Sequence, residues 1–127
     1  MTAAPDPGEQ RAAISNAIVA LFKEFYGKGP VAAKTYFNDD WVFVVLDGGL
    51  TRNEETLVEA GEHALVRQVR LRFQEVVTDR ITAAVADITG RRVVNYHSQL
   101  LLDPVHSVEM FLLAPLPDGH GAERPRA

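Results

Sequence analysis

The chain has 127 residues and a mass of 14.0 kDa, the usual size of one domain. Its formal net charge of −4 and pI near 5.5 argue against a protein that binds nucleic acid through bulk charge. Because the chain has no cysteine, disulfides, thiolate nucleophiles and cysteine-bound zinc are excluded. The lack of cysteine also fits a reducing cytoplasm, where we expect this protein to reside.

The ends of the chain are rich in proline, glycine and polar residues. We expect flexible tails over residues 1–8 and 115–127 and a single α+β domain over 9–114. The first eight residues lack the basic segment and apolar run of a signal peptide. The longest apolar runs, Trp41–Leu46 and Met110–Pro115, are far shorter than the ~20 residues that cross a bilayer. We therefore expect no direct insertion into a membrane.

The first third of the chain predicts a helix followed by a β-hairpin. Glu9–Tyr26 has apolar residues at spacings of three and four, and Gly27 is expected to end this amphipathic helix. Val31–Phe37 and Trp41–Leu46 are predicted strands that flank the turn residues Asn38–Asp40. With a two-residue loop at positions 39 and 40, the register of the hairpin is fixed by the turn.

This register predicts an apolar surface on the first hairpin. One of its faces carries Tyr36, Trp41, Phe43 and Val45, and the second strand is apolar on both faces. A strand of that kind is covered on both sides. Because helices are expected on one side of the sheet, we predict that a second copy covers the other side in a homodimer. The alternative is that the long helix or the C-terminal tail covers it.

The rest of the chain repeats the order of helix and hairpin. Thr51 is a predicted N-cap of a short helix, and His63–Thr89 has the apolar spacing of a long helix that Gly90 ends. Arg91–Leu101 and Val105–Leu113 then predict a second hairpin across an Asp-Pro turn.

The order of elements predicts an α+β two-layer sandwich built as an αββ-αββ pseudo-repeat. The expected sheet has four strands, is mainly antiparallel and has the helices on one face. The alternative is a mixed sheet in which the strands of the two hairpins interleave.

Four basic residues are candidates for binding an anion or an acidic partner. Lys28 lies in the Gly27–Gly29 turn, whose amides and lysine suit an anion, and Lys34 lies on the first strand. Arg67 and Arg70 are one turn apart, predicted on the side of the long helix away from its apolar stripe. The alternatives are helix termination by the glycines and a solvated helix face with ion pairs.

The sequence shows no enzyme motif. The four histidines lack the spacing of metal ligands, and no serine lies in a nucleophile motif. We therefore expect no catalytic residue, no metal and no cofactor. A weaker alternative is a hydrolase or isomerase site around Tyr96, His97 and Glu109.

Several blocks of residues, in this order, resemble the MpsC-like family, a small bacterial domain. The resemblance spans Glu9 to Leu113. It rests on Ala13–Val19, Phe22–Glu24, Gly27–Pro30, Lys34–Tyr36, Asn38–Asp40, Gly49–Thr51, Phe73–Glu75, Thr89–Val94, Ser98–Gln99, Asp103–Pro104 and Val108–Glu109. The family takes its name from a Na+-translocating, membrane-potential-generating system whose membrane subunits perform the transport. The resemblance implies a non-enzymatic accessory domain that binds a protein partner of that system. The alternative from the residues is a small-molecule or anion sensor that uses the Gly27–Gly29 turn and the long-helix arginines.

Overall fold

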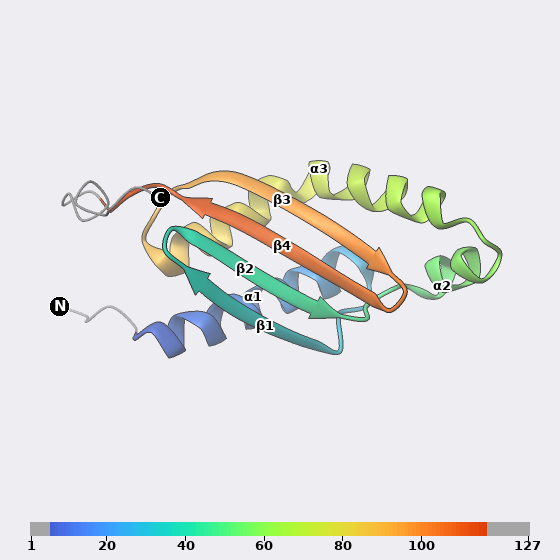
Figure 1. Cartoon of the computed structure of the whole chain (residues 1–127), viewed down its shortest axis with the longest axis horizontal. Helices are drawn as coiled ribbons and strands as arrows, with labels where there is room; N and C mark the ends of the chain where they lie inside the picture. Colours follow the sequence, from blue (N-terminus) through green and yellow to red (C-terminus); the bar gives the residue numbers. More distant parts are fainter. Residues whose placement is uncertain (1–5, 117–127) are drawn as a thin grey trace.

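The structure is a computed structural model and describes residues 6–116. Its three helices and four strands follow one another in the predicted order (Figure 1). They are α1 (Pro7–Tyr26), β1 (Ala32–Asn38), β2 (Trp41–Asp47), α2 (Arg52–Glu59), α3 (His63–Thr89), β3 (Val93–Leu102) and β4 (Val105–Leu113). The predicted α+β class is confirmed.

Helix α1 begins at Pro7, two residues before the predicted start. Asp6 and Glu9 form a capping box, in which the Glu9 amide donates to the Asp6 carboxylate at 2.7 Å and the Asp6 amide donates to Glu9 at 3.1 Å. Proline at the first helical position strengthens this start. Pro7 and Gly8 therefore belong to the helix, not to a tail. Asp6 is the N-cap of this helix, and residues 115 and 116 follow the last strand without regular structure. Residues 1–5 and 117–127 of the expected tails lie outside the described residues.

The sheet is antiparallel throughout, with strand order β1-β2-β4-β3. In the first hairpin Tyr36 pairs with Phe43 and Lys34 with Val45, as the two-residue loop predicts. The alternative of interleaved hairpins is wrong, because the hairpins lie side by side and β2 pairs with β4 along the centre. The edges of the sheet are therefore β1 and β3.

The two αββ units are arranged alike. In each unit a helix ends in a glycine with left-handed backbone, Gly27 (φ 78°) and Gly90 (φ 69°), and an edge strand and a central strand follow. Helix α2 is inserted between the units and lies near one end of the sheet (Figure 1). The pseudo-repeat that the order of elements predicts is thus present in the fold.

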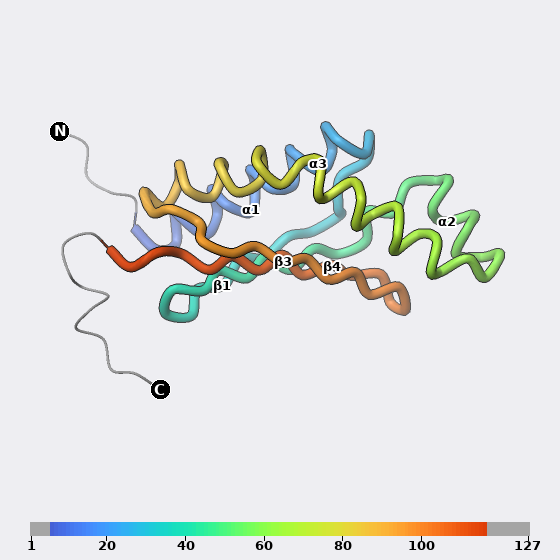
Figure 2. Tube along the Cα trace, turned by 90° about the horizontal axis from the view of Figure 1, so that it is seen from above, coloured from blue at the N-terminus to red at the C-terminus, as the bar shows by residue number. Residues whose placement is uncertain are grey.

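The helices lie on one face of the sheet, which gives the predicted two layers (Figure 2). Helix α1 packs on β1, α3 packs on β3, and the two helices pack against each other. Between the layers lies a core of fully buried side chains, which includes Ile14, Ile18, Val42, Val44, Leu46, Ile81, Val85, Phe111 and Leu113.

Candidate functional site

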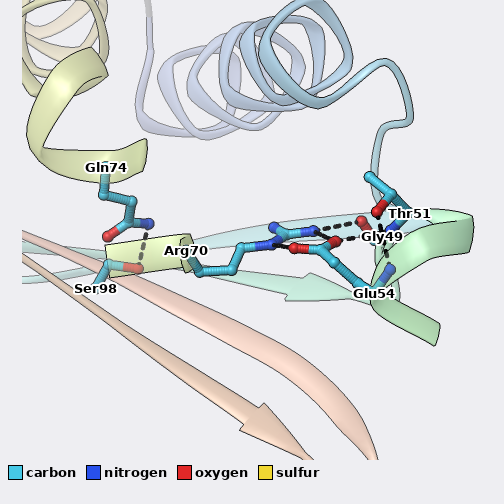
Figure 3. Close-up of polar contacts among 6 residues, drawn as sticks. All are labelled: Gly49, Thr51, Glu54, Arg70, Gln74 and Ser98. Atoms are coloured by element: carbon cyan, nitrogen blue, oxygen red, sulfur yellow. Dashed lines mark hydrogen bonds and ion pairs between the residues drawn. The ribbon is translucent and has the colours of Figure 1, made fainter. Parts of the chain in front are cut away.

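A buried ion pair joins α3 to the start of α2. Arg70 donates from Nε to Glu54 Oε2 at 2.5 Å and from Nη2 to Glu54 Oε1 at 2.6 Å (Figure 3). The same Nη2 donates to the carbonyl of Gly49 at 2.9 Å. The guanidinium carbon lies 3.9 Å from the centre of the Tyr26 ring, a cation–π contact. Arg70 therefore holds together α1, the loop after β2, and α2.

The electrostatics of this pair follow from its burial, since Arg70 and Glu54 are each only 7% exposed. Burial alone raises the pKa of Glu54, but the hydrogen bonds from Arg70 and Thr51 outweigh it and leave that pKa below its usual value. Burial lowers the pKa of Arg70, and the hydrogen bonds and charge of Glu54 outweigh that effect. Burial raises the pKa of Tyr26 to about 12. Both charges of the ion pair therefore persist at neutral pH.

The position of Arg70 corrects the expectation that it lies on the exposed side of α3. Its guanidinium is already bound by Glu54, so it is not an open cation for an acidic partner. The spacing of residues gave no signal for this pair, because the partners lie 16 residues apart on different helices. Glu54 offered one local clue, as it also closes the capping box with Thr51.

A second polar network surrounds Glu109, which is fully buried on the inner face of β4. Its carboxylate accepts hydrogen bonds from the Tyr96 hydroxyl, from Ser98 Oγ at 2.7 Å and from Gln74 Nε2 at 3.2 Å. Gln74 also donates to Ser98 at 2.6 Å (Figure 3). Burial raises the pKa of Glu109 despite these donors, and burial together with the charge of Glu109 raises the pKa of Tyr96.

A small cavity of about 200 Å³ opens beside these networks, between α3 and the inner face of β3 and β4. Arg67, Arg70 and Gln74 line it from α3, and Ser98 and Ser107 line it from the strands. The cavity thus brings Arg67 and Arg70 together, as the sequence suggested, but with Arg70 as part of a buried wall. The sequence motifs did not identify Ser98, Ser107 or Gln74 as site residues.

The outer face of the sheet carries the four residues that were predicted to form an interface. Tyr36 is 45% exposed, while Trp41, Phe43 and Val45 are partly exposed. Trp41 and Phe43 stack with ring centres 6.1 Å apart. Strand β4 extends this apolar surface with Val108, Met110 and Leu112, which pair with the β2 residues. Within residues 6–116 no helix covers this face (Figure 2), so the alternative that α3 covers it is wrong.

The remaining basic candidates lie apart from the cavity. Lys28 follows α1 and its Nζ is 4.0 Å from the carboxylate of Glu55 on α2. Gly27 caps α1, in agreement with its role in ending the helix. Lys34 lies on β1 with its Nζ 5.4 Å from the centre of the Tyr36 ring, at the margin of the outer face. The four candidates therefore do not converge on one anion site.

The alternative catalytic trio is divided by the sheet. Tyr96 and Glu109 are joined by a hydrogen bond on the inner face. His97 pairs with Met110 on the outer face and is exposed, because successive residues of a strand point to opposite sides. These three side chains do not share a site.

Comparison with known proteins identifies the family of this chain. The family described as "Na+-translocating membrane potential-generating system (MpsC)" matches residues 7–114. The chain belongs to the MpsC family. One relative of this MpsC protein is the uncharacterized protein YbcI of Bacillus subtilis, 30% identical over 94 residues, which are 73% of this chain and 76% of the relative. No solved structure matches the chain significantly.

The name of the MpsC family refers to a membrane system. Among residues 6–116, none of the helices combines the length and the hydrophobicity that a bilayer span requires. In the same residues no group of three or more histidine, aspartate or glutamate side chains is arranged to hold a metal ion.

Proposed function

We propose that this MpsC protein is a non-enzymatic, cytoplasmic accessory component of a Na+-translocating, membrane-potential-generating system. In this proposal it works as a homodimer and binds a protein partner of that system. Membership of the family supports the link to the system. The observation that carries the mode of action is the apolar outer face of the sheet, which the helices of the described chain leave open.

A second copy of the chain is the occupant that fits this face best. Its centre consists of uncharged, largely aromatic and aliphatic side chains from β2 and β4, as interface cores do. The charged and polar groups of the face lie at its margin, among them Lys34, His97 and Asp47. Two twisted sheets can pack face to face, and a two-fold axis makes such a contact self-complementary.

In such a dimer the partner protein would contact the margin of the outer sheet face and the helix layer. Among the basic candidates, Lys28, Lys34 and Arg67 are exposed, whereas Arg70 is not. Dispersed exposed charges of this kind steer association and select partners more than they add affinity. We therefore propose that these three side chains contact an acidic surface of the partner.

The oligomeric state tests the first part of the proposal. Light scattering coupled to gel filtration should give a mass near twice the chain mass of 14.0 kDa, at low and high salt. Phe43→Lys should give a monomer with an unchanged circular dichroism spectrum. Val76→Lys is the matched control, because Val76 is an apolar residue of α3 that is already 82% exposed. A monomeric wild-type chain, or a dimeric Phe43→Lys variant, would refute the dimer.

The link to the transport system has a separate test in cells. Cells that lack the protein should develop a smaller Na+-dependent membrane potential, measured with a voltage-sensitive dye. Wild-type protein should restore the potential, and a Lys28→Glu, Arg67→Glu variant that still dimerises should not. An unchanged potential in cells without the protein contradicts the proposed role.

A further inference from the structure

The cavity between α3 and the inner face of β3 and β4 has the features of a ligand site. It is held by rigid elements, with one wall formed by a helix and the other by two paired strands. Phe22, Leu71 and Leu100 supply its apolar surface. Its polar groups come from Arg67, Arg70, Gln74, Ser98 and Ser107. Apolar walls with a few convergent polar groups are typical of small-molecule sites.

Ser107 is the observation that points most directly to a ligand. It is only 7% exposed, it lines the cavity, and within residues 6–116 its hydroxyl makes no side-chain hydrogen bond. The Ser107 hydroxyl therefore opens onto the cavity and is not sealed inside the core. A molecule bound in the cavity can donate a hydrogen bond to it or accept one from it. The other serine of the cavity, Ser98, is already engaged by Gln74 and Glu109.

Arg67 supplies the cavity with a positive charge that is not neutralised by an ion pair within residues 6–116. Arg70 is neutralised by Glu54, whereas Arg67 is exposed and, within the described part of the chain, has no ion pair. A guanidinium at the mouth of a partly apolar cavity favours a planar carboxylate, which it can bind through two parallel hydrogen bonds.

The inner end of the cavity determines which further functional groups a ligand can have. Ser107, Ser98 and Gln74 offer hydroxyl and amide groups without charge, and the carboxyl group of Glu109 lies directly behind Ser98 and Gln74. These uncharged groups suit a hydroxyl or keto oxygen, whereas a second anionic group would be buried at this end without a positive charge to balance it. At ~30 Å³ for each water molecule, the volume holds about seven non-hydrogen atoms.

We propose that this cavity binds a small monocarboxylate that carries a hydroxyl or keto group, such as lactate. The carboxylate meets Arg67 at the mouth, and the hydroxyl or keto oxygen meets Ser107 inside. This site is independent of the proposed dimer, because it lies on the helix side of the sheet, opposite the apolar outer face. The proposed dimer and the proposed ligand site can therefore fail separately, whereas Arg67 is shared between the ligand site and the proposed partner contact.

An NMR titration of the ¹⁵N-labelled full chain with sodium lactate, at ionic strength held constant with sodium chloride, tests the site. Saturable shifts are expected for the amides of Ser98, Gln99 and Ser107. Propionate lacks the hydroxyl and should bind more weakly. Phosphate should bind more weakly as well, because the inner end of the cavity offers no positive charge to balance its additional charge. Absence of saturable shifts, or phosphate binding as tight as lactate binding, would overturn the proposal.

Two variants distinguish the site from a general attraction of anions. Arg67→Gln should weaken lactate binding about tenfold or more, since charge-assisted hydrogen bonds are lost. Arg72→Gln is the matched control, because the Arg72 side chain is 80% exposed on the same helix and does not line the cavity. Ser107→Ala should weaken lactate binding but leave propionate binding unchanged. Equal effects of the Arg67 and Arg72 variants would refute the assigned role of Arg67.

Discussion

Arg70 and Glu54 form a two-point ion pair, with nitrogen–oxygen distances of 2.5 and 2.6 Å, that fixes α2 to α3. Glu54 is the buried residue of α2, whose other side chains are at least partly exposed. The short helix is therefore anchored by a buried charge in addition to Leu57 and Val58, which pack against the buried cluster of Leu50, Val66 and Leu102. The stacking of Arg70 on Tyr26 extends the same anchor to the end of α1.

Replacement of Arg70 by methionine should be strongly destabilising. It leaves the Glu54 carboxylate buried without its partner, which costs about 3–5 kcal/mol in comparable cases. Urea unfolding followed by circular dichroism measures the loss. Arg67→Met on the same helix is the control and should change stability by less than about 0.5 kcal/mol, because Arg67 is exposed. Addition of Glu54→Leu to the Arg70 variant should recover part of the loss, and a further loss would contradict this account.

The buried Glu109 should make stability fall as pH rises. Burial raises the pKa of Glu109 in the folded chain above the usual value of 4.5, so between the two values the folded state keeps a proton that the unfolded state releases. The contribution of Glu109 is therefore most favourable below about pH 4.5 and is lost as pH rises through the folded pKa. Glu54 has the opposite shift, and its contribution is lost on acidification below about pH 4.5.

Glu109→Gln isolates this effect, because Glu54 is the same in both proteins. The stability of the variant relative to wild type should increase with pH between about pH 4 and 8, measured by urea unfolding at each pH. Glu75→Gln serves as the control, since the Glu75 side chain is 61% exposed. A stability difference that stays constant across this pH range would show that Glu109 titrates normally.

Trp41 should report the proposed dimer directly, because it is the single tryptophan of the chain and lies on the outer face of the sheet. On dilution its fluorescence emission should move to longer wavelength as the indole becomes exposed to water. The Phe43→Lys variant should show the long-wavelength emission at every concentration. An emission maximum of the wild-type chain that does not depend on concentration, together with a monomeric mass, would exclude this interface.

Two glycines should differ in how well they tolerate alanine. Gly90 caps α3 at φ 69° and a Cβ there meets nothing within 4 Å, so Gly90→Ala should cost only the backbone strain of about 1 kcal/mol. Gly49 has φ 93°, and a Cβ there would lie 3.2 Å from the Cα of Pro30. Gly49→Ala should therefore be more destabilising than Gly90→Ala in thermal unfolding. Equal losses would mean that the loop after β2 adapts to the side chain.

The sequence by itself determined the elements, the hairpin register and the two faces of the sheet. These features depend on short-range rules: helical spacing, left-handed glycine caps and turns of fixed length. Once the turn at Asp39–Asp40 is placed, strand alternation sends Val42 and Val44 inward and Trp41 and Phe43 outward. The same alternation places His97 and Glu109 on opposite faces of the sheet. The sequence nevertheless suggested a single alternative catalytic site for both residues.

Only the tertiary structure decided which charges are buried and what they contact. Arg70 lies on the same face of α3 as the buried Val66 and Val77, yet a charged side chain there was expected to be exposed. It is enclosed because Glu54 of α2 and Tyr26 at the end of α1 contact its guanidinium. Glu109 is paired by groups from β3 and α3 that are up to 35 residues away. A charge becomes buried through the elements that meet around it, and local patterns carry no information about which elements meet.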